Sequence, residues 1–203
     1  MPAASDVLVL ASGSPRRRDL LRAAGVAIET IPPRVEEKVA PGESPADLVT
    51  RLAREKALEV AHRLGPEPER IVLGSDTVVV LDGDVLGKPD DPAHAVAMLT
   101  RLAGRSHEVF TGVAVVSSHA LAPHPLHRAS TVTLRPAGRD ELERYVATGE
   151  PLDKAGAYAI QGGAGAFVAE LDGPEDNVIG LPVALVRQLM GEFGLRGDGV
   201  GGR

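Results

Sequence analysis

The stretch LVLASGSPRRRDLLRAAG, Leu8–Gly25, decides the fold. An apolar run typical of a buried strand ends in four small residues, and a helix is expected to begin directly after them. Ser14 and Pro15 are residue types that favour the N-cap and the first position of a helix, and Gly25 is typical of a helix end. The stretch therefore predicts a strand–turn–helix unit, which is a building block of α/β folds.

Three consecutive arginines, Arg16–Arg18, lie at the expected start of this helix. The helix dipole disfavours cations there by about 0.3–1 kcal/mol each. The same helix end presents backbone N–H groups, and the small residues before it allow a phosphate to approach closely. Arginines bind phosphate oxygens in a bidentate manner. The stretch is thus either a phosphate-binding turn or a plain capped helix with solvated arginines, and it lacks the Gly-Lys-Ser/Thr ending of a Walker loop.

The same pattern of a cap, a proline and a closing glycine recurs along the chain. It predicts helices over 45–64 and 92–103, and apolar periodicity predicts two more over 139–148 and 181–194. Further strands are expected over apolar runs at 71–75, 77–81, 85–86, 109–116 and 129–134. These elements predict an α/β fold with a mixed twisted sheet and flanking helices.

The remaining segments are read as turns, loops or tail. Asp82-Gly83 is a strong hairpin signal between two of the expected strands. The histidine-containing segment 119–129 is expected to be a solvated loop rather than a metal site. We expect one domain over 1–195 and a disordered tail over 196–203, where little can be buried.

Composition restricts the class of protein. The chain has 203 residues, 43% hydrophobic and 25% charged, and a formal net charge of −6. These values are ordinary for a soluble globular protein and disfavour general binding to nucleic acid or to anionic membranes. The absence of cysteine excludes disulfides and thiolate metal sites. No signal peptide or membrane-spanning run is recognisable, so we expect a cytoplasmic protein.

Lys56 occupies an unusual position on the expected helix 45–64. On a helical wheel it falls between Leu52 and Val49, near the middle of the apolar stripe. A lysine directed at a core is unfavourable unless its stem snorkels to solvent or its ammonium meets an anion. Both interpretations remain open from the sequence.

Three further charged positions have both a functional and a plain interpretation. Asp76 follows the apolar run IVLGS and is expected either at a strand end facing a crevice or capping a turn. Lys88 lies in a tight Gly-Lys-Pro loop and could be an exposed turn lysine. Glu36 and Glu37 form an acidic pair in a proline-rich loop and could simply be solvated. Together, clustered cations and carboxylates are what hydrolysis of a nucleoside triphosphate requires, with carboxylates holding a divalent cation and orienting water.

Six motifs in order carry a resemblance to a known family: LASGSPRRRDLL, RLAREKA, GSDTVVVLDGDVLGKP, GRSHEVFTGVAVV, EPLDKAGAYAIQG and GLPVALV. They resemble the Maf family of nucleotide pyrophosphatases from about Leu8 to about Met190. The resemblance implies two lobes around a central cleft, similar to inosine triphosphate pyrophosphatases. It also implies a cytoplasmic hydrolase that cleaves the bond between the α- and β-phosphates of a nucleoside triphosphate.

The resemblance also implies roles for individual residues. Asp76 matches the catalytic base that accepts a proton from water, and Glu37 matches a metal-associated glutamate that would share a Mg or Mn ion with Asp76. The phosphate-binding positions of the family are matched by Ser12, Arg16, Arg17, Lys56 and Lys88. Arg18 matches none of them and is expected to be solvated.

Substrate preference is implied by Arg16, Thr77 and Gln161, which match the subgroup acting on dTTP and UTP. A glutamine amide can pair with the N3–H and the adjacent carbonyl of thymine or uracil. Modified pyrimidine nucleotides are possible further substrates. The alternatives are the same chemistry on 7-methyl-GTP or another purine triphosphate, and a nucleotide-binding regulator of septum formation.

The expected partner is thus a small nucleotide, with neither nucleic acid nor membrane, and a homodimer is left open. One segment departs from the family pattern. Gly173–Asn177 reads Gly-Pro-Glu-Asp-Asn where a Gly-Ser-Tyr-like loop is expected.

Overall fold

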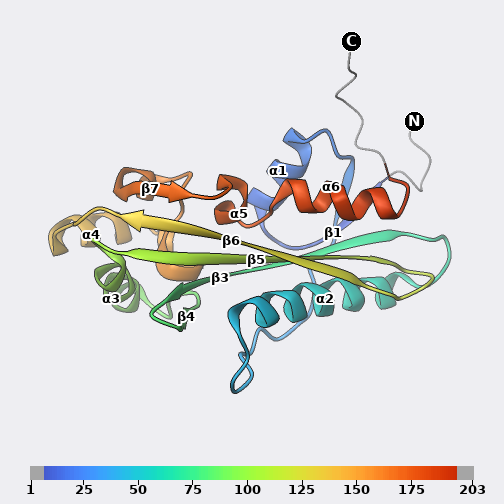
Figure 1. Ribbon diagram of the computed structural model, residues 1–203, viewed down its shortest axis with the longest axis horizontal. Coiled ribbons are helices and arrows are strands. Elements are labelled where there is room, and N and C mark those ends of the chain that lie inside the picture. Colours follow the sequence, from blue (N-terminus) through green and yellow to red (C-terminus); the bar gives the residue numbers. More distant parts are fainter. Residues whose placement is uncertain (1–6, 196–203) are drawn as a thin grey trace, which may run out of the picture. The chain divides into compact units, whose positions relative to one another are not determined.

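A computed structural model describes residues 7–195 of the chain. The strands of the described part form one seven-stranded sheet: β1 (Leu8–Ala11), β2 (Ile28–Thr30), β3 (Ile71–Leu81), β4 (Asp84–Leu86), β5 (Ser106–Ser117), β6 (His124–Leu134) and β7 (Val168–Asp172). The α-helices are α1 (Pro15–Ala23), α2 (Pro45–Leu64), α3 (Pro92–Leu102), α4 (Arg139–Val146), α5 (Glu175–Ile179) and α6 (Val183–Glu192) (Figure 1). Short 3₁₀ helices are η2 (Glu150–Asp153), η3 (Ala155–Ala157) and η4 (Gly163–Phe167). No helix of the described part is long and apolar enough to cross a membrane.

The sheet contains both parallel and antiparallel pairs. Its strand order is β2-β1-β3-β5-β6-β7, and β4 pairs with β3. β1 is parallel to β2 and to β3, whereas β4 is antiparallel to β3 and β7 is antiparallel to β6. The predicted α/β fold with a mixed sheet is confirmed.

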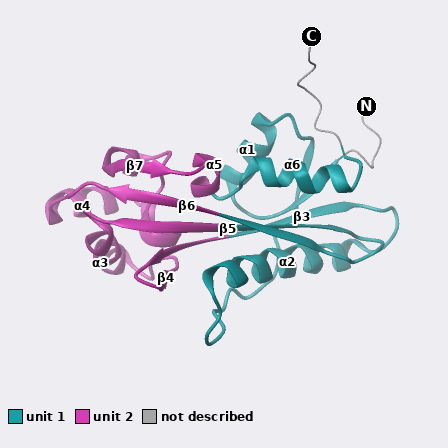
Figure 2. Cartoon of the chain, in the orientation of Figure 1, with its two compact units in different colours: residues 1–76, 111–128, 180–203 teal, residues 77–110, 129–179 magenta. Residues whose placement is uncertain are grey.

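The chain divides into two compact units (Figure 2). Unit 1 contains residues 1–76, 111–128 and 180–203, and unit 2 contains residues 77–110 and 129–179. The predicted single domain over 1–195 remains a prediction, and the predicted tail over 196–203 lies outside the described residues.

In unit 1, helices cover both faces of the sheet, with α1 and α6 on one face and α2 on the other (Figure 1). The alternation of side chains along β1 explains this arrangement. Leu8 and Leu10 pack into the cluster that includes α1 and α6, whereas Val9 and Ala11 pack with α2. A strand buried on both faces reads as a continuous apolar run, as LVLA does.

Glycines in two neighbouring strands allow α2 to lie very close to the sheet. A Cβ atom on Gly74 of β3 would lie 2.1 Å from the carbonyl oxygen of Ala53. A Cβ atom on Gly112 of β5 would lie 2.2 Å from the carbonyl oxygen of Val49. Both contacts are impossible for any other residue, so these glycines determine how closely α2 approaches β3. That spacing matters because Lys56 follows on the same helix.

Unit 2 has its own core, formed by apolar side chains from α3, α4, the 3₁₀ segments and the unit 2 parts of the sheet. Tyr145 of α4 is buried there and its ring meets that of Phe167 edge-on at 5.5 Å. The Asp82-Gly83 hairpin predicted from the sequence joins β3 to β4.

Several local expectations were wrong in instructive ways. Asp76 is not at a strand end and caps no turn, because β3 runs without interruption through it to Leu81. Strand β6 begins at His124, so the predicted loop 119–129 is shorter than expected. Residues 124–129 are mostly exposed, and a strand without a buried face lacks the apolar alternation that reveals strands in a sequence. Ser14 occupies the N-cap of α1, but its side chain makes no capping hydrogen bond.

Candidate active site

Lys56 is the centre of a buried charged cluster in unit 1. Its side chain is only 5% exposed, and its Nζ atom donates to Glu37 Oε1 at 2.5 Å and to Asp76 Oδ1 at 2.6 Å. Of the two interpretations of this lysine, the one in which the ammonium meets an anion is therefore correct. The anions in the structure are carboxylates. A role in phosphate binding remains a prediction.

The two carboxylates of this cluster come from very different settings. Asp76 is buried within β3, whereas Glu37 belongs to an irregular loop and is half exposed. The adjacent Glu36 turns instead to Lys38 in a surface ion pair. The acidic pair of the sequence thus separates, and only Glu37 joins the cluster. Within residues 7–195, Lys56 uses two of its three N–H donors on these carboxylates, which leaves one for a ligand oxygen.

Arg17 connects three segments of unit 1. Its Nε donates to the carbonyl oxygen of Gly180 at 2.8 Å, and its Nη1 donates to that of Ser75 at 2.9 Å and to Ser12 Oγ at 3.4 Å. Burial lowers the pKa of Arg17, while the nearby charges of Asp76 and Glu37 oppose that shift. The guanidinium therefore joins the end of β1, the middle of β3 and the segment before α6 beside the carboxylate cluster.

The other two arginines of the opening stretch behave differently from Arg17. Arg16 is half-buried and close enough to Arg17 to contribute to the lowering of its pKa. Among residues 7–195 it makes no hydrogen bond or ion pair, so its guanidinium is available to an anion. Arg18 pairs at 3.5 Å with the exposed carboxylate of Asp19. The Arg18 side chain is 40% exposed, but its Nε atom is buried and forms no hydrogen bond within residues 7–195. The three arginines thus have different surroundings, and their different roles remain predictions.

Ser12 and Ser75 are small polar residues buried beside this cluster. Ser12 Oγ accepts a hydrogen bond from Ser14 N at 3.1 Å, and this bond shapes the turn between β1 and α1. Ser75 Oγ donates to the Gly180 carbonyl oxygen at 3.1 Å, which Arg17 also binds. Ser12 was predicted as a site residue, but Ser75 and Gly180 were not. Gly180 lies 163 residues from Arg17 in the chain, so no local pattern could have linked them.

The remaining predicted residues belong to unit 2. Thr77 directly follows Asp76 in β3 and is half-buried. Lys88 is exposed in the loop after β4, and Gln161 is exposed in the loop between η3 and η4. Their predicted roles in phosphate and base recognition remain predictions.

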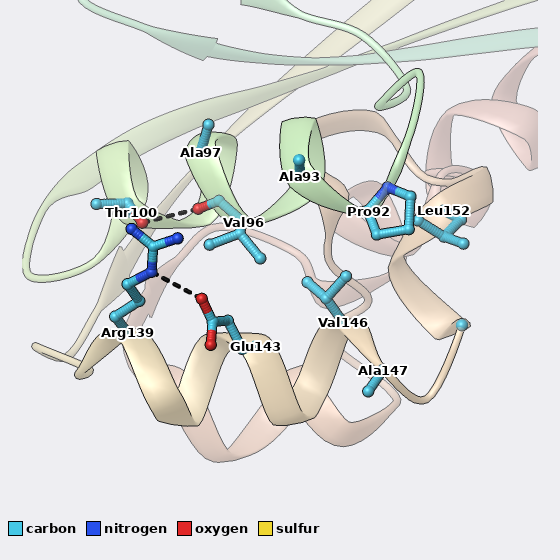
Figure 3. A pocket seen from close by; sticks show the side chains of 11 residues that line it. Pro92, Ala93, Val96, Ala97, Thr100, Arg139, Glu143, Val146, Ala147 and Leu152 are labelled. Atoms are coloured by element: carbon cyan, nitrogen blue, oxygen red, sulfur yellow. Dashed lines mark hydrogen bonds and ion pairs between the residues drawn. The ribbon is translucent and has the colours of Figure 1, made fainter.

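A pocket of about 720 Å³ lies between α3 and α4 in unit 2 (Figure 3). Its walls are mainly apolar, with Val96 and Val146 facing each other. Arg139, at one edge, is paired with Glu143 at 2.7 Å. None of the predicted site residues lines this pocket, and its charged groups neutralise each other. It is therefore poorly suited to a triphosphate.

The carboxylate cluster fits a divalent cation that arrives with a nucleotide. Asp76 Oδ1 and Glu37 Oε1 bind the same ammonium, so they lie no farther apart than the sum of two short hydrogen bonds. Mg²⁺ commonly binds one or two protein carboxylates and takes its other ligands from water and substrate phosphates. No group of three or more metal-ligating side chains occurs among the described residues.

Comparison with known proteins agrees with the fold and the motifs. The family model described as Maf-like protein matches residues 7–193. A dTTP/UTP pyrophosphatase of Symbiobacterium thermophilum is 49% identical over 187 residues, which cover 92% of this chain and 94% of that protein. A dTTP/UTP pyrophosphatase of Photorhabdus laumondii is 46% identical over 194 residues, covering 96% of this chain and 97% of that protein.

A solved structure supports the fold class independently. The structure of a HAM1 protein from Coxiella burnetii aligns with a TM-score of 0.50 at 15% identity and covers 92% of this chain and 98% of that chain. At this identity the likeness concerns the fold alone. The family model matches nearly all of the described residues, and the two relatives are 49% and 46% identical over 94% and 97% of their own lengths. These matches establish that the chain belongs to the Maf family.

Proposed function

We propose that this protein hydrolyses dTTP and UTP to the nucleoside monophosphate and pyrophosphate. The observation that carries the proposal is the buried Lys56–Asp76–Glu37 cluster, in a chain that aligns along its length with relatives named dTTP/UTP pyrophosphatase. Charged groups are unfavourable in a protein interior unless they serve each other or a ligand. A triphosphate and its cation are ligands that such a cluster suits.

In the proposed reaction, Asp76 accepts a proton from a water molecule as the water oxygen forms a bond to the α-phosphorus. The bond between the α-phosphorus and the bridging oxygen breaks, and pyrophosphate leaves with the electron pair. General-base catalysis of this kind contributes about 10²–10⁴-fold to a rate. Lys56 and the proposed phosphate ligands Ser12, Arg16, Arg17 and Lys88 stabilise the charge on the triphosphate.

Glu37 and Asp76 would hold a divalent cation, Mg or Mn, together with the substrate. When bound, this cation neutralises charge on the phosphate oxygens and so lowers the barrier to attack by an anionic or polar nucleophile. The third N–H of Lys56 is suited to a phosphate oxygen, because the other two already hold both carboxylates in place.

Base recognition is proposed from the resemblance, through Arg16, Thr77 and Gln161. Gln161 offers one donor and one acceptor on an exposed amide, which matches the N3–H and carbonyl of a pyrimidine. Location in the cytoplasm and action on modified pyrimidine nucleotides are proposed on the same ground.

Pyrophosphate release from dTTP, UTP, CTP, GTP and 7-methyl-GTP, each measured with Mg²⁺ and with Mn²⁺, tests the proposal. The kcat/KM for dTTP and UTP should exceed that for each purine nucleotide by about 10–100-fold, the discrimination expected of one bidentate contact to a base. A preference for a purine nucleotide would contradict the substrate assignment. Tight binding of nucleotide without any release of pyrophosphate would contradict the enzymatic role itself.

A further inference from the structure

The loop that carries Gln161 is anchored by two side chains that have no role in the proposed chemistry. Tyr145 of α4 accepts a hydrogen bond from the backbone N–H of Ala159, its oxygen lying 3.3 Å from that nitrogen. Glu150 Oε2 accepts one from the backbone N–H of Gly163 at 3.0 Å. Gln161 lies midway between these two backbone groups, two residues from each. The turn is therefore fixed on both sides of the residue proposed to recognise the base.

The two anchoring side chains are also bonded to each other. The hydroxyl of Tyr145 donates to Glu150 Oε1 at 2.9 Å, so both carboxylate oxygens of Glu150 accept a hydrogen bond. Within the turn, Gly162 N donates to the carbonyl oxygen of Ala159 at 3.0 Å. Tyr145, Glu150 and the turn 159–163 thus form a closed ring of hydrogen bonds, which we name the Tyr145–Glu150 bracket.

Gly162 makes the bracket sterically possible. A Cβ atom at this position would lie 2.0 Å from Glu150 Oε1 and 2.5 Å from its carboxyl carbon. A side chain there would push the carboxylate away from the turn. The absence of a side chain at Gly162 is thus required for Glu150 to reach past it to the N–H of Gly163.

The base of the bracket is buried, whereas residues 161–163 of the turn are exposed. Tyr145 is 6% exposed and packs edge-on against Phe167. Tyr158, just before the turn, lies outside the bracket: it is buried and its hydroxyl lies 2.7 Å from His107 Nε2. Burial lowers the pKa of His107 to about 4, so that ring is neutral at physiological pH. Gln161 itself is exposed.

We propose that Tyr145 and Glu150 are positioning residues that fix the turn of Gln161 for recognition of the pyrimidine base. The inference rests on the proposed function, because it assigns their effect to Gln161. An amide discriminates between bases only when its donor and acceptor are held at the right place and angle, which requires a supported backbone. Glu150 is not assigned a catalytic role, since both of its oxygens are already engaged with the turn and with Tyr145.

The test measures kcat and KM for UTP and for GTP in Tyr145→Phe and Glu150→Gln. Tyr145→Phe removes the hydroxyl and with it the hydrogen bonds to Glu150 and to Ala159 N. Glu150→Gln replaces one accepting oxygen by a donor of similar size. We expect the ratio of kcat/KM for UTP over GTP to fall about tenfold in each, at the lower end of the value of a bidentate base contact. The change should appear mainly as a higher KM for UTP, with kcat/KM for GTP unaltered.

Two matched variants control for general damage to unit 2. Tyr158→Phe deletes the other buried phenol hydroxyl, which bonds His107 and not the turn. Glu143→Gln changes another carboxylate, which pairs with Arg139 at the edge of the pocket between α3 and α4. Both should keep the wild-type UTP over GTP ratio. Melting temperatures of all variants are measured in parallel. Gly162→Ala displaces the Glu150 carboxylate in a different way and should lower the UTP over GTP ratio as the bracket variants do.

Combination with Gln161→Ala separates this inference from the proposed function. Gln161→Ala alone should lower the UTP over GTP ratio, and adding Glu150→Gln should then change it no further, because the two substitutions act through one contact. If Gln161→Ala leaves the ratio unchanged, the proposed role of Gln161 fails and the bracket proposal falls with it. If Gln161→Ala lowers the ratio while the bracket variants do not, or if they lower UTP and GTP hydrolysis equally, the function stands and the bracket proposal is overturned.

Discussion

Two carboxylates in this protein are held in opposite ways. In unit 1, Asp76 is buried and bound to the ammonium of Lys56, which also binds Glu37. In unit 2, Glu150 is bound by a neutral phenol and a backbone N–H. The first arrangement balances charge with charge, and the second uses neutral donors to hold the shape of a turn.

The difference indicates what each region can exchange with a ligand. The two ion pairs that Lys56 makes with Asp76 and Glu37 can be rearranged by a bound polyanion and a cation. The ammonium can pair with the polyanion, and the carboxylates can pair with the cation. The Tyr145–Glu150 bracket instead joins a phenol and a carboxylate to backbone N–H groups of the turn. We therefore expect substitutions in unit 1 to change turnover and substitutions in the bracket to change selectivity.

The largest expected effect is that of Asp76→Asn. Loss of the general base should lower kcat by about 10²–10⁴-fold while nucleotide binding persists. Pyrophosphate release and titration calorimetry measure the two properties. Asp82→Asn is the matched control, because within residues 7–195 Asp82 pairs with Arg105 alone, at the exposed hairpin, and turnover of this variant should stay at the wild-type level. Near wild-type turnover in Asp76→Asn would remove Asp76 from the role of base.

The next prediction concerns the free energy of unfolding, which one substitution in each region should lower by a different amount. Lys56→Met leaves the buried carboxylate of Asp76 without its cation and should lower the free energy of unfolding by about 3–5 kcal/mol. Tyr145→Phe removes a neutral donor that bonds the carboxylate of Glu150 and should lower it by about 1.5–3 kcal/mol. Urea denaturation of both variants measures the difference. Equal losses would show that the charged cluster and the neutral bracket are energetically alike, against the distinction drawn above.

A smaller effect separates neighbouring arginines within unit 1. Arg17→Ala leaves the carbonyl oxygens of Ser75 and Gly180 without their charged donor, and the displaced segments should lower kcat/KM by about 100-fold. Arg18→Ala removes a long ion pair, 3.5 Å, with the exposed carboxylate of Asp19 and should change stability by less than about 0.5 kcal/mol, with turnover nearly unchanged. Steady-state kinetics on the two variants decides the matter. Similar losses in both would place Arg18 in the site as well.

The smallest effect concerns the distance between α2 and the sheet. Gly74→Ala would place a methyl group 2.1 Å from the carbonyl oxygen of Ala53, so the helix that carries Lys56 must shift. Overpacking of this kind costs about 1–3 kcal/mol. Gly191→Ala in α6 is the control, since its new Cβ meets no atom within 4 Å and should stabilise the helix by up to about 1 kcal/mol. Thermal melts should therefore move in opposite directions, and a neutral Gly74→Ala would disprove the close approach.

Features with a local cause could be predicted from the sequence. Helix α2 has the predicted bounds, with Ser44 as its N-cap, Pro45 at its first position and Gly65 directly after its end. The wheel position of Lys56 predicts a lysine on the apolar face of α2, because a helix repeats every 3.6 residues whatever surrounds it. Whether it snorkels or meets an anion could not be predicted.

Features that depend on distant segments could not be predicted. Strand β2 has three residues and α5 has five, too short for any periodicity to appear. Asn177, in the segment that departs from the family pattern, is buried in α5 and donates to the carbonyl oxygen of Val109 and to Ser130 Oγ. These partners lie 68 and 47 residues away in the chain, so only the folded sheet reveals them.

The division of the chain into two units has a consequence for its evolution by recombination. Unit 1 is assembled from three segments and unit 2 from two, and the four junctions fall after residues 76, 110, 128 and 179. Three of these crossover points interrupt β3, β5 and β6 rather than loops. An exchange of gene fragments between relatives would therefore have to cut through the middle of strands. Lineages of this fold should consequently change base preference by single substitutions, such as those within the Gln161 turn, and not by transfer of a whole module.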